Sequence, residues 1–160
     1  MNLRMFLLGC CAALALGVVT VASAAAPVVT DTDIALHSLG ADPVVSDACG
    51  FDVEVLNEGR IRSFEYANGS IQQHHQETFY WQANDRALTE RVSFTMTRNG
   101  NETAFRGTVF HVVVPGVGPV LVEAGQAVFG PNGAIVRIAG LHQVLEGAAN
   151  PRALCDYLSG

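Results

Sequence analysis

The side chains best suited to chemistry lie together in one stretch, residues 70–81 (SIQQHHQETFYW). His74 and His75 are two of only five histidines in the chain, and Trp81 is its only tryptophan. Imidazole close to carboxylate can bind a metal ion, transfer a proton or hydrogen-bond a small ligand. Neighbouring residues of a β-strand point to opposite faces, however, so the two histidines cannot bind one ion unless the strand bulges. We therefore expect no metal site here.

A β-strand over residues 70–81 divides these side chains between two faces. The two sets are His75, Glu77, Phe79 and Trp81, and His74, Gln76, Thr78 and Tyr80. Either set, if it faces inward, places polar groups at one end and aromatic walls at the other, which is the general form of a small-ligand site. We take the set that begins with His75 as the candidate ligand-binding residues. The alternative is a solvated strand end whose aromatic side chains fill the core.

Signatures of the common catalytic and nucleotide-binding sites are absent from the sequence. It contains no G-x-S-x-G, S-x-x-K, H-E-x-x-H or P-loop sequence, and no dinucleotide-binding glycine pattern. His111 lies among valines and is expected to be a core or rim histidine, and Glu123 is expected on the outer face of its strand. We therefore predict a protein without a cofactor that is not an enzyme. An isomerase or cyclase that uses His75 with Glu77 or Glu123 is a further alternative.

The first 26 residues have the pattern of a secretory signal peptide. Arg4 precedes the uncharged run MFLLGCCAALALGVVTVA, and small residues follow. Ala22 and Ala24 form an A-x-A cleavage site, with cleavage after Ala24, and cleavage after Ala26 is the alternative. An uncleaved membrane anchor is the other interpretation, although the apolar run is barely long enough to span a bilayer. We predict a secreted, extracytoplasmic protein that meets a membrane only through an uncleaved signal segment.

The chain that remains after cleavage is acidic. Eight arginines and no lysine stand against fifteen aspartates and glutamates, which gives a formal charge of −7 once Arg4 is removed. Nucleic acids and anionic lipids are bound by clustered cations that neutralise phosphate. We therefore expect neither of them as a partner, and we interpret the negative charge as a source of solubility.

Two of the four cysteines, Cys49 and Cys155, remain after cleavage. They are not arranged as C-x-x-C, so the spacing does not indicate redox chemistry. Two cysteines in an exported chain predict one structural disulfide. By chain entropy, a bridge across so long a loop stabilises the fold by about 4–5 kcal/mol.

Hydrophobic alternation predicts seven strands joined by tight turns, among them Glu58–Gly59, Asn68–Gly69 and Asn99–Gly100. The strands span residues 51–55, 60–66, 70–81, 88–98, 103–114, 120–129 and 134–145. A short helix is predicted over residues 150–158. Residues 27–48 lack sustained periodicity, and we expect them to form an extended leader.

The arrangement of these strands predicts an all-β fold for residues 49–160. Gly107, Gly125 and Gly140 lie inside three consecutive strands, where glycine allows the kinks that a closing sheet needs. We predict one antiparallel up-and-down β-barrel of about seven or eight strands, with a β-sandwich as the alternative. The two cysteines flank the first and last of these strands, so their disulfide would join the edges where the barrel closes.

Several of these features together resemble a group of small secreted proteins of actinobacteria. The shared features are Cys49-Gly50-Phe51, Asn99-Gly100, Phe129-x-x-x-Gly133 with Gly140, and Leu154-Cys155-x-x-Leu158. The resemblance covers most of residues 49–158 and implies export and an all-β fold. It implies no activity, since none is established for the group. By architecture alone, the expected barrel is also similar to calycin-type and allene-oxide-cyclase-type barrels.

These observations favour a secreted protein that binds a small, partly apolar molecule in the lumen of a barrel. The alternative is a structural or interaction module of the cell envelope, which works through its outer face or an exposed apolar patch. The first function needs an internal cavity, and the second does not.

Overall fold

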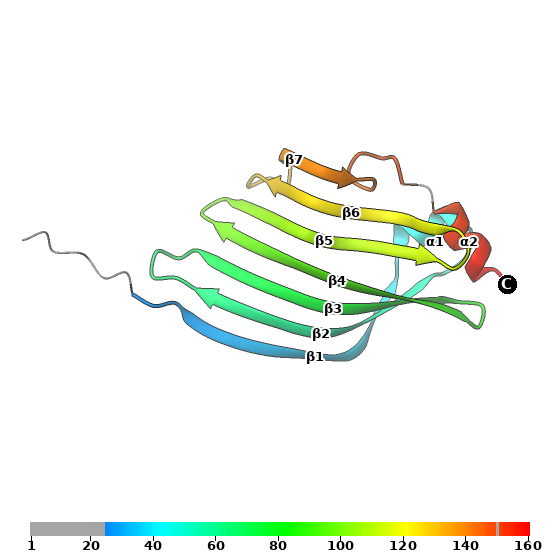
Figure 1. The fold of residues 1–160 in the computed structure, drawn as a ribbon, viewed down its shortest axis with the longest axis horizontal. Coiled ribbons are helices and arrows are strands. Elements are labelled where there is room, and N and C mark those ends of the chain that lie inside the picture. Colours follow the sequence, from blue (N-terminus) through cyan, green and yellow to red (C-terminus); the bar gives the residue numbers. More distant parts are fainter. Residues whose placement is uncertain (1–24, 150) are drawn as a thin grey trace, which may run out of the picture.

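The computed structural model describes residues 25–149 and 151–160, so the predicted signal peptide lies almost entirely outside the described residues. One sheet of seven antiparallel strands runs in sequence order (Figure 1). The strands are β1 (Val28–Ala41), β2 (Glu54–Glu65), β3 (Ile71–Ala83), β4 (Arg86–Asn99), β5 (Glu102–Val114), β6 (Gly118–Phe129) and β7 (Ile135–His142), and the helices are α1 (Pro43–Cys49) and α2 (Arg152–Leu158). The antiparallel meander and the short C-terminal helix are thus confirmed.

The sheet is not closed, so the prediction of a barrel was wrong. β1 pairs with β2 and β7 pairs with β6, and these two outer strands do not pair with each other. Glycine kinks bend a sheet, but closure also requires the number, tilt and stagger of the strands to agree. In place of a lumen, the protein has an inner face, by which we mean the side of the open sheet against which α1 and α2 pack.

The segment 27–48, expected to be a leader, contains β1 and α1. β1 pairs with β2 from Val28 opposite Glu65 to Ala41 opposite Glu54. Its side chains are almost all exposed, because it forms one edge of the sheet. An exposed edge strand needs no hydrophobic alternation, and charged side chains on it discourage pairing with other chains.

The two strands predicted over residues 51–66 are one strand, β2, so the turn predicted at Glu58–Gly59 is absent. Gly59 instead bends the strand where it passes β3, and a Cβ at this position would lie 2.4 Å from the carbonyl oxygen of Gln76. A polar residue followed by glycine, such as Glu58–Gly59, occurs both in turns and at bends within strands, so the sequence alone does not distinguish the two. The hairpins predicted at Asn68–Gly69 and Asn99–Gly100 are confirmed.

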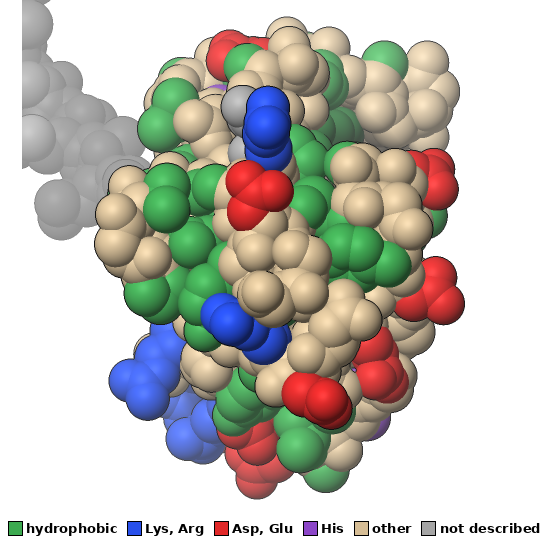
Figure 2. Space-filling model, turned by 90° about the vertical axis from the view of Figure 1, so that its right-hand side faces the viewer, with side chains coloured by type: hydrophobic (Ala, Val, Ile, Leu, Met, Phe, Trp, Pro, Cys, Tyr) green, Lys and Arg blue, Asp and Glu red, His purple; other side chains and the backbone are tan. Residues whose placement is uncertain are grey.

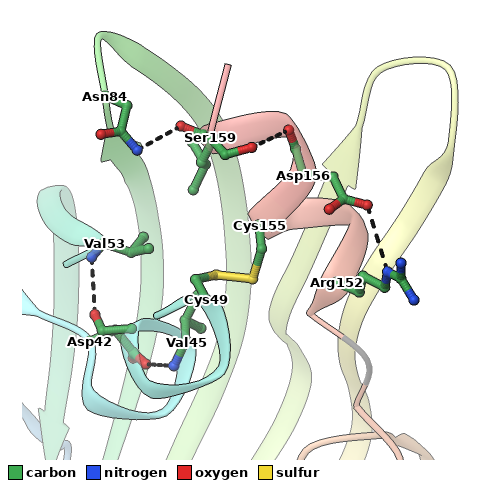
Figure 3. The surroundings of a disulfide bond; sticks show 11 residues. Asp42, Val45, Cys49, Val53, Asn84, Arg152, Cys155, Asp156 and Ser159 are labelled. Carbon is green, nitrogen blue, oxygen red and sulfur yellow. Dashed lines mark hydrogen bonds and ion pairs between the residues drawn. A yellow bond between two sulfur atoms is a disulfide. The ribbon is translucent and has the colours of Figure 1, made fainter. Parts of the chain in front are cut away.

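Both helices lie at the same end of the sheet, where the predicted disulfide Cys49–Cys155 joins them (Figures 1 and 3). α1 begins at Pro43, and the carboxylate of Asp42 caps it by accepting a hydrogen bond from the Val45 amide at 2.8 Å. α2 inserts Leu154 and Leu158 into the core, where both are fully buried. No helix in the described part of the chain is long and apolar enough to cross a membrane.

The sheet is split between β4 and β5 at the helix end. These strands pair only from Ser93 opposite Thr108 to Asn99 opposite Glu102, and their other halves diverge (Figure 1). α2 contacts both strands beside the split. Backbone groups along the split lose their partners in the sheet and need others, because a buried amide without a hydrogen bond is costly.

Candidate functional site

The inner face holds three apolar hollows that meet at Phe110. The β6 hollow, about 200 Å³, is lined by Phe105, Ala127 and Phe129 and bordered by Val144 and Leu145 after β7. The β3 hollow, about 260 Å³, is lined by Phe79, Trp81 and Phe94. The helix hollow, about 290 Å³, lies between Trp81, Leu121 and α1 residues Val44, Val45 and Ala48. Phe110 lines all three hollows, so it lies where they meet.

Strand β3 presents the His75 set to the inner face. Trp81 is 3 % exposed, belongs to the core cluster and also lines two of the hollows, and Phe79 packs against the same core. His75 and Glu77 lie farther along the same face. The other set faces outward, with His74 and Gln76 exposed. Phe79 and Trp81 thus pack in the core and also line hollows, whereas His75 and Glu77 line none of the three inner hollows.

His75 and Glu77 form a close pair. The Nδ1 atom of His75 lies 2.6 Å from Oε1 of Glu77, whose other oxygen accepts a hydrogen bond from the Asn57 side chain at 2.9 Å. The imidazole stacks on Phe94, with ring centroids 4.3 Å apart. Its Nε2 atom is buried and has no hydrogen-bond partner among the described residues. An Nδ1–H held by a carboxylate leaves Nε2 as an acceptor, but here that atom is closed to solvent.

Glu123 faces inward, contrary to the expectation that it lies on the outer face. It is buried and lines the β6 hollow together with Phe105 and Ala127. Its carboxylate accepts hydrogen bonds from His142 Nδ1 at 2.9 Å, from the Leu145 amide at 3.0 Å and from the Val144 amide. Three donors compensate the burial of a charge that would otherwise be unfavourable.

His142 is the partner of Glu123 that the sequence did not indicate. Its second ring nitrogen, Nε2, lies 3.2 Å from the carbonyl oxygen of Ala139, so both nitrogens face acceptors. Burial alone would lower the pKa of His142, but the hydrogen bonds with Glu123 and Ala139 outweigh it and raise this pKa. Glu123 is thus bound to His142 and to the segment after β7. Of the two carboxylates that the sequence offered as partners of His75, Glu77 contacts His75 and Glu123 does not.

Glu90 is a buried carboxylate that the sequence reasoning missed. It is 2 % exposed and lies at the split between β4 and β5, where it accepts a hydrogen bond from the His111 amide across the gap. Its other oxygen accepts one from Trp81 Nε1 at 3.0 Å. The side chain thus replaces a missing backbone partner and orients Trp81, whereas the His111 side chain itself is exposed. Glu90 stands between Leu88 and Val92 in an alternating apolar series, and this position was the signal in the sequence that its side chain is buried.

Comparisons with known proteins add no information about this arrangement. No protein-family model, curated protein or solved structure matches the chain. The function must therefore be argued from the geometry alone.

A wider hollow of about 600 Å³, which we call the outer hollow, lies among the outer-face residues Arg60, Arg62, His74 and Arg106 and also borders His75 and Phe94. Asp31 forms ion pairs with Arg60 at 3.3 Å and with Arg62 at 3.1 Å. Its lining side chains are largely exposed and already hydrogen-bonded or paired, so we regard it as a solvated polar face. No cluster of three or more potential metal-ligating side chains occurs in the described residues.

The buried state of Glu90 predicts a specific pH dependence of stability. Burial raises the pKa of Glu90 above its ordinary value of 4.5, and the hydrogen bonds from His111 and Trp81 only partly oppose this. A raised folded-state pKa means that the unfolded chain releases the proton first as pH rises. The free energy of unfolding of the wild type, relative to Glu90→Gln, should therefore fall as pH rises above about 4.5.

Urea unfolding of both proteins at pH 4 and pH 7 measures this difference. Glu54→Gln is the control, because hydrogen bonds from Gln82 and Ser38 lower the pKa of the exposed Glu54. Its pH dependence should have the opposite sign. A wild-type advantage over Glu90→Gln that grows with pH would show that Glu90 is held ionised by its two donors.

Proposed function

We propose that the protein binds a small apolar molecule on the inner face of its open sheet. The observation that carries this proposal is the meeting of three apolar hollows at Phe110, a space that the chain's own side chains leave unfilled. The hollows, of 200–290 Å³ each, are partly open to solvent and walled mainly by apolar side chains, and concave apolar sites of this kind are typical of small-molecule binding. The proposal places the ligand in an open trough instead of the closed lumen expected from the sequence.

The size and lining of the hollows support this proposal. An apolar cavity of roughly 150 Å³ is enough to bind benzene. Each hollow exceeds that volume, and the aromatic side chains of Phe79, Trp81, Phe94, Phe105 and Phe129 stand around them. Aromatic walls favour edge-to-face or offset contacts with ring-containing ligands. The unpaired edges of β1 and β7 leave a side of the trough without a strand, through which a ligand can enter.

Replacing Phe110 should change ligand binding more than it changes the fold. Phe110→Trp puts a larger ring at the junction of the hollows, so we expect the affinity for N-phenyl-1-naphthylamine to fall at least about tenfold, equivalent to 1.4 kcal/mol. The fluorescence of this apolar probe, titrated with protein, reports its dissociation constant. Phe64→Trp is the matched control, because Phe64 lines the outer hollow. Equal affinities in the two variants and the wild type, with unchanged melting temperatures, would contradict the proposal.

We propose that the protein acts outside the cytoplasm. The disulfide Cys49–Cys155 is consistent with an oxidising compartment, and the N-terminal sequence has the pattern of a signal peptide. The geometry favours binding over catalysis, because the two histidine–carboxylate pairs on the inner face contact different residues and do not converge on one hollow.

A second candidate function is that of an interaction module of the cell envelope. It is favoured by the unpaired edge of β7, where Ile135, Val136 and Leu141 are 45, 61 and 50 % exposed. The helix end, by contrast, shows hydrophobic side chains interrupted by charged and other polar groups (Figure 2). A protein that works through the β7 edge would keep its function in Phe110→Trp and lose it when a proline is placed at Val136.

A further inference from the structure

We infer that the ligand of the inner face is uncharged, and that the hollows discriminate against anions such as carboxylates. This inference rests on the proposed function and adds to it the chemical class of the ligand. It is argued from the charged groups that border the three hollows and from the partners that these groups already have.

Carboxylates outnumber cations around the hollows. Glu123 and Asp42 line them, and Glu90 accepts a hydrogen bond from the indole of Trp81 behind their wall. Among the described residues that line the three hollows, none is an arginine, and His142 is the one group there that can carry a positive charge. Arg60, Arg62 and Arg106 line the outer hollow instead. A ligand carboxylate would therefore meet no unpaired cation among the described residues that line these hollows.

The donors that could compensate an anion are already in use. Both ring nitrogens of His142 are engaged, by Glu123 and by the Ala139 carbonyl. The amides of Val144 and Leu145, which border the β6 hollow, donate to Glu123. Burying an ion without a partner costs far more than burying a neutral polar group. An anion in the β6 hollow would have to break the Glu123 network before it gained one hydrogen bond.

A cationic ligand gains little more, because Glu123 is satisfied and Asp42 already accepts the capping hydrogen bond of α1. Glu123 accepts three hydrogen bonds, and Asp42 is occupied as the cap of α1 (Figure 3). Desolvating an ammonium group to reach oxygens that already have donors is unfavourable. The walls that remain accessible are the faces and edges of aromatic rings and the methyl groups of aliphatic side chains. They fit an uncharged molecule with one or two rings.

Three compounds with the same naphthalene ring, and with one small neutral, anionic or cationic substituent, test this inference. The wild-type protein is first loaded with N-phenyl-1-naphthylamine at pH 7. It is then titrated separately with 2-naphthylmethanol, 2-naphthoate and 2-naphthylmethylammonium as competitors. We expect the alcohol to displace the probe at a concentration at least tenfold lower than either ion. Displacement by naphthoate or by the ammonium compound at the same or lower concentration would overturn the inference and leave the proposed function intact. Failure of N-phenyl-1-naphthylamine itself to bind would remove both.

Introducing a cation at the wall of the hollows tests the inference independently. Val109 is half-buried and lines both the β6 and β3 hollows, at a register shift of β5. Val109→Arg should increase the affinity for naphthoate at least tenfold relative to Val109→Gln, its uncharged control of similar polarity. The alcohol should bind the two variants equally. No gain for naphthoate in a folded Val109→Arg protein would show that charge does not set the selectivity.

Discussion

Replacing both Cys49 and Cys155 by alanine is expected to lower the free energy of unfolding by about 4–5 kcal/mol. The bridge joins residues 106 positions apart, so in the unfolded state it closes a loop that contains β2 to β7. The free energy of unfolding of a domain of this size is typically about 5–15 kcal/mol, so the loss is a large share of the total. Urea unfolding with and without the substitutions measures it.

The disulfide also holds the two helices in place. α1 and α2 have seven residues each, too few to be stable on their own. α2 supplies the fully buried Leu154 and Leu158, and the Asn84 side chain donates a hydrogen bond to the Leu158 carbonyl at 3.2 Å (Figure 3). Without the bridge, α2 is tied to the sheet mainly by these contacts, so we expect it to detach before the sheet unfolds.

The control for the double substitution is the wild type under reducing conditions. Its stability should match that of the Cys49→Ala/Cys155→Ala protein, and reductant should not affect the variant. A loss of less than about 1 kcal/mol would mean that the unfolded chain is already compact enough for the bridge to add little, or that the native bridge does not form.

Local signals predicted local features correctly. The Asn-Gly pairs marked two hairpins, alternation placed most of β3 to β6, and the two cysteines left outside the predicted signal peptide indicated the disulfide. The alternation in residues 70–81 also placed His75 and Glu77 on one face, where they are in contact. These inferences succeeded because each depends on residues close together in the chain or on a pairing with one possible solution.

Features that depend on distant parts of the chain were not predictable in this way. Whether β1 meets β7 is decided by twist and stagger accumulated over the whole sheet. β1 was missed because its solvated edge position removes the hydrophobic pattern. Phe110 lies after a register shift in β5, which alternation cannot locate, and Glu90 is tolerated in the core only because β4 and β5 diverge beside it.

The glycines inside β5, β6 and β7 are in register and should not tolerate a side chain. Gly107 pairs with Gly125, which pairs with Gly140, so the bends of three neighbouring strands align. Gly125 has a φ of +135°, and a Cβ there would lie 2.2 Å from the Ala139 carbonyl oxygen and 2.8 Å from the Gly140 Cα. We expect Gly125→Ala to lower the free energy of unfolding by at least about 3 kcal/mol, because both conformational strain and a backbone clash oppose it.

Gly133→Ala separates these two causes. Gly133 also has a positive φ, +75°, but a Cβ there would meet no atom within 4 Å. Its substitution should therefore cost only the conformational strain, about 1 kcal/mol. If Gly125→Ala were no more destabilising than Gly133→Ala in urea unfolding, β6 and β7 would have room to move apart. The bend of the sheet around the β6 hollow, whose wall includes Gly107 and Gly125, would then not depend on close approach of the strands. A large difference would show that the aligned glycines hold the sheet in the curvature that shapes the hollow, since no other residue lets β6 and β7 approach so closely at that point.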